Sequence, residues 1–65
     1  MAAVVQVLIE ASEPLHVAEI HRAVERQLGR EVNYRSVKGC LSEGAARRPP
    51  RFERINYGEY RLAEF

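Results

Sequence analysis

The apolar positions in the N-terminal half of the chain recur every three to four residues, the period of a helix with one buried face. Residues 2–11 show this period, and so do residues 17–28. Pro14 separates the two segments, because the residue before a proline avoids the helical region. We therefore predict two helices, each with one apolar stripe facing a core. The stripes comprise Val4, Val5, Leu8, Ile9 and Ala11 in the first segment, and Val17, Ile20, Ala23, Val24 and Leu28 in the second.

The second predicted helix has signals at both of its ends. His16 stands at the N-cap position and Glu19 follows three residues later, as in a capping box, although histidine is not a favoured cap. Gly29 is well placed to end the helix in the left-handed conformation. On the polar face, we expect Glu25 to pair with Arg22.

A third helix is predicted over residues 34–43, after Asn33, which is a favoured N-cap residue. Val37 and Leu41 are four residues apart, so we expect them to face the core and to share it with the second helix. Gly39 lies in the interior of this helix, where glycine costs about 0.5–1 kcal/mol relative to alanine. It either allows a partner to approach closely or marks a tight crossing of two helices.

The C-terminal part of the chain predicts a β-hairpin over residues 51–62. The preceding "AARRPPR" is irregular, because two prolines exclude a central helix or strand. Gly58 supplies the positive φ angle for a turn between two candidate strands, one with Phe52 and Ile55 and the other with Tyr60 and Leu62. Strict alternation would place Phe52 and Ile55 on opposite faces, so a bulge or a strand covered on both faces is needed if both belong to the core.

Composition narrows the class of protein. Sixty-five residues make one domain, and 46% hydrophobic with 29% charged residues is typical of a globular chain. A lone Cys40 fits a reducing compartment, so we expect a cytoplasmic protein, and no apolar run is long enough for a membrane span. No aspartate occurs, and His16, His21 and Cys40 are not spaced as metal ligands. We expect no enzyme activity, cofactor, metal or small-molecule substrate.

Charge is distributed unevenly along the chain. Residues 1–29 hold two arginines and four glutamates, a formal charge of −2, whereas residues 30–65 hold eight lysines or arginines and five glutamates, a formal charge of +3. This asymmetry indicates one basic side, although a solvated surface of mixed charge would look similar.

Three helices followed by a hairpin predict an α+β fold: a three-helix bundle with a helix-turn-helix, then a two-stranded wing, in one winged-helix domain over residues 1–65. The segments "EPLHVAEIHRAVERQLG-REVNYRSVKGCLSE" and "PPRFERINYGEYRL" resemble winged helix-turn-helix domains. They are similar to HARE-type modules and to the small winged helices of bacterial restriction and DNA-modification enzymes. This resemblance implies a cytoplasmic, nucleoid-associated bacterial protein that binds double-stranded DNA, either alone or as part of a larger enzyme or regulator.

In such a domain the third helix enters the major groove with its N-terminal residues at the base edges. Arg35 is suited to guanine and Asn33 to adenine, unless Asn33 only caps the helix. For Arg35 and Lys38 the alternative is a solvated helix face. The DNA-binding residues predicted in and before this helix are Asn33, Tyr34, Arg35, Ser36 and Lys38.

A second group of candidate DNA contacts follows the third helix. Arginines in a flexible segment are expected to contact phosphates, and the alternative is a solubilising loop. Tyr57, at the hairpin tip, either reaches DNA or covers the apolar face of its own hairpin. The rival function is a protein-interaction winged helix, which would use the first helix or the Tyr57 and Tyr60 region. The candidates in this group are Arg47, Arg48, Arg51, Arg54 and Tyr57.

Overall fold

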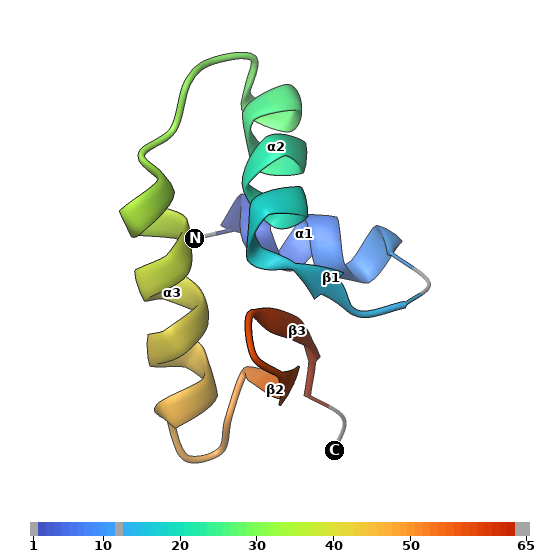
Figure 1. The fold of residues 1–65 in the computed structure, drawn as a ribbon, viewed down its shortest axis with the longest axis vertical. Coiled ribbons are helices and arrows are strands. Elements are labelled where there is room, and N and C mark those ends of the chain that lie inside the picture. Colours follow the sequence, from blue (N-terminus) through green and yellow to red (C-terminus); the bar gives the residue numbers. More distant parts are fainter. Residues whose placement is uncertain (1, 12, 64–65) are drawn as a thin grey trace.

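The described part of the computed structural model comprises residues 2–11 and 13–63. These residues form three helices and a small antiparallel sheet, which is an α+β arrangement. Figure 1 shows α2 beside α3, with the hairpin of β2 and β3 near the C-terminal end of α3. The elements in chain order are α1 (Ala2–Glu10), β1 (Leu15–His16), α2 (Val17–Leu28), α3 (Tyr34–Ala46), β2 (Phe52–Asn56) and β3 (Glu59–Leu62).

The three predicted helices are present, with differences at their ends. α1 ends at Glu10 rather than at residue 11, although the N–H of Ala11 still donates to the carbonyl of Val7 at 3.1 Å. α3 continues to Ala46, three residues beyond its predicted end. Gly44 remains helical, and the prolines that exclude a helix follow only at residues 49 and 50.

The predicted caps of α2 are confirmed. The ring Nδ1 of His16 accepts a hydrogen bond from the N–H of Ala18 at 3.2 Å. The carboxylate of Glu19 accepts one from the backbone N–H of His16 at 3.0 Å, which completes the capping box. At the other end Gly29 has φ of 68° and donates its N–H to the carbonyl of Glu25 at 2.8 Å. Histidine therefore fills the role of the usual hydroxyl or amide cap.

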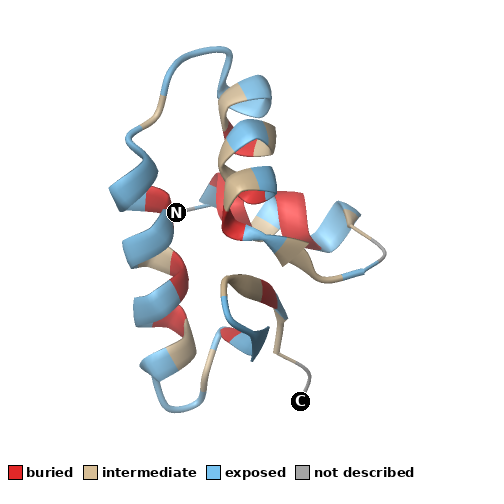
Figure 2. Ribbon diagram, in the orientation of Figure 1, coloured by how far each residue is buried: buried red, intermediate tan, exposed pale blue. Residues whose placement is uncertain are grey.

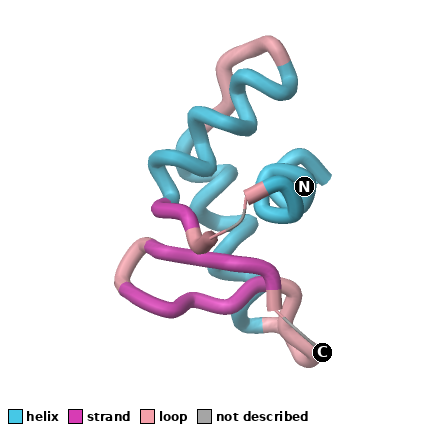
Figure 3. The backbone as a smooth tube through the Cα atoms, turned by 90° about the vertical axis from the view of Figure 1, so that its right-hand side faces the viewer, coloured by secondary structure: helices cyan, strands magenta, loops and turns pink. Residues whose placement is uncertain are grey.

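The sheet has three strands, in the order β1–β3–β2, rather than the two that were predicted. β1 pairs antiparallel with β3, so that Leu15 lies opposite Tyr60. In Figure 3 this short strand runs beside the hairpin and continues directly into α2. Two residues are too few to show an alternating pattern, so this strand could not be recognised from the sequence.

The hairpin contains a bulge between Arg54 and Asn56, one of the two arrangements considered from the sequence. It does not bring Ile55 into the core, however: Ile55 is 39% exposed, whereas Phe52 is 1% exposed. Phe52 is therefore a core residue and Ile55 is not. The turn at Gly58 has φ of 76°, as predicted.

One hydrophobic core joins the helices to the sheet, and its members lie on the inward-facing surfaces in Figure 2. The prediction that the second and third helices share a core is confirmed, since Ile20, Val24, Val37 and Leu41 are fully buried. The other buried members are Ala3, Val4, Val7, Leu8, Val17, Phe52 and Tyr60.

Two apolar residues of the predicted stripes are exposed. Ile9 is 58% exposed, because the buried arc of α1 runs through Ala3, Val4, Val7 and Leu8, one position away from the predicted stripe. Leu28 is the last residue of α2 and is also exposed. Spacing alone located both helices but misjudged these two positions.

Candidate nucleic-acid interface

The turn between α2 and α3 is held by two side chains of α2. A carboxylate oxygen of Glu25 accepts a hydrogen bond from the N–H of Val32 at 2.9 Å. Nε2 of His21 lies 2.6 Å from the carbonyl oxygen of Val32, to which it donates, and 3.4 Å from the Glu25 carboxylate. Both backbone polar groups of Val32 are therefore satisfied by α2, and we call His21, Glu25 and Val32 the turn clamp. Glu25 therefore contacts His21 and Val32, and not Arg22, its predicted partner.

The start of α3 is fixed directly after the clamp. Oδ1 of Asn33 accepts a hydrogen bond from the N–H of Arg35 at 2.8 Å, so the predicted N-cap is confirmed. The oxygen that a bidentate contact to adenine would need is thus already engaged. Tyr34 packs its ring against His21, with 5.4 Å between ring centroids and 59° between ring planes.

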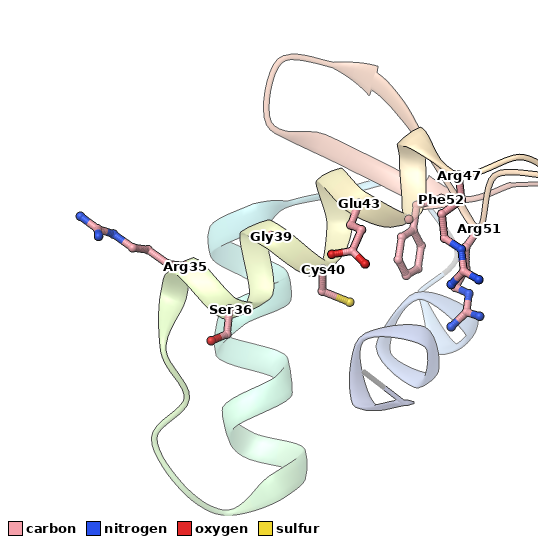
Figure 4. Close-up of a pocket in the computed structure, with 9 residues that line it drawn as sticks. Arg35, Ser36, Gly39, Cys40, Glu43, Arg47, Arg51 and Phe52 are labelled. Carbon is pink, nitrogen blue, oxygen red and sulfur yellow. The ribbon is translucent and has the colours of Figure 1, made fainter.

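The two faces of α3 differ sharply. Val37 and Leu41 are fully buried, as predicted, whereas Arg35, Ser36 and Lys38 are exposed. In Figure 4 the guanidinium of Arg35 extends away from the body of the domain. The candidate residues at the N-terminal half of α3 are therefore presented to solvent by a helix whose other face is anchored.

The two glycines of α3 have opposite surroundings. A Cβ added to Gly39 would meet nothing within 4 Å, so the tight helix crossing considered from the sequence is wrong. A Cβ added to Gly44 would overlap the ring of Phe52. The close approach within the fold therefore occurs at Gly44, which the sequence reading did not single out.

A hollow of about 430 Å³ runs along one side of α3. In Figure 4 the side chains of Cys40, Glu43 and Phe52 lie near it, and Arg47 and Arg51 lie at its far end. The guanidinium groups of Arg47 and Arg51 and the carboxylate of Glu43 therefore border this hollow, whereas the Arg35 guanidinium points away from it. The lining residues are Arg35, Ser36, Gly39, Cys40, Glu43, Gly44, Arg47, Arg51 and Phe52.

Residues 47–51, which we call the basic loop, are irregular as predicted. They are also tied to the fold, contrary to the expected flexible segment. The N–H of Arg51 donates to the carbonyl of Gly44 at 2.8 Å, and the carbonyl of Arg51 accepts from the N–H of Ala63 at 3.1 Å. Arg47, Arg48 and Arg51 are exposed, so the loop holds three cations on an anchored backbone.

The tip and the strands of the hairpin present different groups. Tyr57 is 90% exposed at the tip, so the alternative that it covers the apolar face of the hairpin is wrong. On the strands, Nε of Arg61 donates to the Glu53 carboxylate at 2.6 Å. Arg54 is exposed and lies opposite Tyr60 in the register, on the face of the sheet that carries Phe52.

Two glutamates of the described residues form ion pairs, and neither of them pairs with a candidate DNA-binding cation. Within residues 2–11 and 13–63, the ion pairs are His21 with Glu25 and Arg61 with Glu53. Glu19 serves the cap of α2. The basic candidate residues therefore have no acidic partner in the described part of the chain. These residues are Arg35, Lys38, Arg47, Arg48, Arg51 and Arg54.

The turn clamp is the feature that sequence reasoning missed. His21 and Glu25 stand four apart on α2, a spacing that places both side chains on one face, close to the turn that follows. That spacing was the signal in the sequence that could have indicated the turn clamp.

Across the described ranges, no group of three or more His, Cys, Asp or Glu residues could hold a metal ion. The described helices are also all too short or too polar to cross a membrane.

Comparisons of this chain with protein-family models, with curated proteins and with solved structures give no match in any of the three.

Proposed function

We propose that the chain is a winged helix-turn-helix module that binds double-stranded DNA. In this proposal α3 enters the major groove, and the hairpin acts as a wing on the DNA backbone. The observation that carries it is the pair of exposed cations, Arg35 and Lys38, on a helix whose opposite face is buried and whose start is fixed by the turn clamp. A binding helix needs this combination of an anchored face and a polar outer face.

The residues divide into two roles. Arg35 is suited to bind guanine through O6 and N7, and Tyr34 and Ser36 flank it at the start of α3. The basic loop, together with Arg54 and Tyr57 of the hairpin, is suited to phosphate contacts, which fix register and supply most of the affinity. Asn33 contributes as the cap that orients this end of α3.

The test is a salt titration of binding to a preferred duplex and to a random duplex, the preferred site being selected from a random pool. Arg35→Ala should weaken the preferred duplex by about 1–3 kcal/mol and relax preference at one base pair. Arg26→Ala is the matched control, because it removes the same charge from α2, at a position that lies beside α1. Equal loss on every sequence would make Arg35 a phosphate contact, and no loss would remove α3 from the interface.

A protein-interaction module is the second candidate, and the exposed Ile9 on α1 favours it. Tyr57 remains available for such a contact, whereas Tyr60 is buried and is not. The same titration separates the two functions: no duplex binding by the wild type at low salt would favour this candidate. As a DNA-binding module it would act either as part of a larger restriction, modification or regulatory protein or as a small free-standing DNA binder.

A further inference from the structure

Gly39 is the one glycine of this chain that the fold itself does not require. All four glycines of the sequence lie within the described residues. Gly29 and Gly58 have positive φ angles, and Gly44 lies against the ring of Phe52. Gly39 is helical and exposed, and a Cβ there would meet nothing within 4 Å. Because glycine destabilises a helix interior relative to alanine, its presence points to something outside the chain.

The position of Gly39 indicates what approaches it. It follows Arg35 by one turn and is adjacent to Lys38, on the side of α3 opposite the buried Val37 and Leu41. Glu43 follows one turn later, so Arg35, Gly39 and Glu43 are spaced by four. In Figure 4 this middle turn shows bare backbone between the two charged side chains, at the edge of the hollow.

We infer that Gly39 is a close-contact position, at which the base-pair edges of a bound duplex meet the backbone of α3. This inference rests on the proposed DNA binding and adds a residue that acts by shape rather than by charge. A side chain at this position would hold the helix away from the base edges. Protein hydrogen bonds have donor–acceptor distances of about 2.7–3.2 Å, so a displacement of about 1 Å would take the contacts of Arg35 out of this range.

The experiment compares Gly39→Ala and Gly39→Leu with the wild type, measuring both melting temperature and affinity for the preferred duplex. Gly39→Ala should raise the melting temperature by about 2–8 °C, because alanine favours the helix and meets no neighbour. It should weaken duplex binding about tenfold or more, and Gly39→Leu should weaken it further. Ser42→Ala is the control on the same helix: it also favours the helix but adds no bulk, so its affinity should change little.

The outcomes separate this inference from the proposed function. If the wild type binds duplex DNA and Gly39→Ala binds equally well, Gly39 is not a contact position and DNA binding stands. If the wild type binds no duplex at low salt, both proposals are overturned. A lower melting temperature for Gly39→Ala would mean that the fold itself needs the glycine. Analytical ultracentrifugation of the same variants provides a further check. If Gly39→Ala changes the sedimentation of the chain but not its affinity for the duplex, Gly39 contacts a second copy of the chain and not DNA.

Discussion

Gly44→Ala tests the closest packing contact between α3 and the hairpin. The added Cβ would overlap the ring of Phe52, which is 1% exposed and therefore has little room to move. We expect this variant to be destabilised. Gly39→Ala makes the same substitution in the same helix, where the added Cβ meets nothing within 4 Å.

The pair of variants isolates the steric cost. Both gain the same preference of alanine over glycine in a helix, about 0.5–1 kcal/mol, so this contribution cancels in their difference. What remains is the cost of overpacking at Gly44, about 1–3 kcal/mol. For a domain of this size, 1 kcal/mol shifts the melting temperature by about 4–8 °C, so Gly44→Ala should melt about 4–24 °C below Gly39→Ala.

Thermal unfolding followed by far-ultraviolet circular dichroism measures both variants, and urea unfolding provides the free energies. A second check is Phe52→Leu in the Gly44→Ala background, which should recover part of the loss because leucine is smaller than the ring. Equal melting temperatures for Gly39→Ala and Gly44→Ala would refute the close contact between α3 and Phe52.

Three further predictions concern the core, the turn and the basic loop. Leu41→Ala should cost about 2–5 kcal/mol, because Leu41 is fully buried, and urea unfolding measures the loss; a normal midpoint would contradict this core position. Glu25→Ala should cost about 1–2 kcal/mol and speed hydrogen exchange at the Val32 amide, whereas unchanged exchange would mean that the turn clamp does not form in solution. Replacing Arg47 and Arg48 by alanine should flatten the slope of log K against log salt on duplex DNA by up to about 1.8 while preserving base preference. An unchanged slope would place the basic loop away from DNA.

Local patterns in the sequence predicted most of the fold because its helices and turns are specified by nearby residues. The caps at His16, Gly29 and Asn33 each depend on hydrogen bonds spanning four residues or fewer. The four-residue spacing of Val37 and Leu41 likewise identified the buried face of α3. These features needed no knowledge of tertiary structure.

The features that were missed depend on contacts between distant segments. β1 exists only because β3 lies beside it, and Gly44 is needed only because Phe52 reaches it. Glu25 accepts a hydrogen bond from a backbone group seven residues away and pairs with His21, not with Arg22. For the candidate interface, the basic residues could be identified from the sequence. The structure was needed to show that Arg61 is hydrogen-bonded to the Glu53 carboxylate and that Tyr57 is exposed.

The short strand β1 has a mechanical consequence. It pairs with β3, and the N–H of Val17, at the start of α2, donates to the carbonyl of Gly58 in the hairpin turn at 2.9 Å. The tip of the hairpin is thereby fastened to one end of α2, while the other end of α2 holds the start of α3 through the turn clamp. The distance between the hairpin tip and the start of α3 is therefore determined within the fold. If the domain binds DNA as proposed, a duplex whose contact positions are spaced differently would have to bend to fit, and the stiffness of the duplex would then contribute to the choice of site.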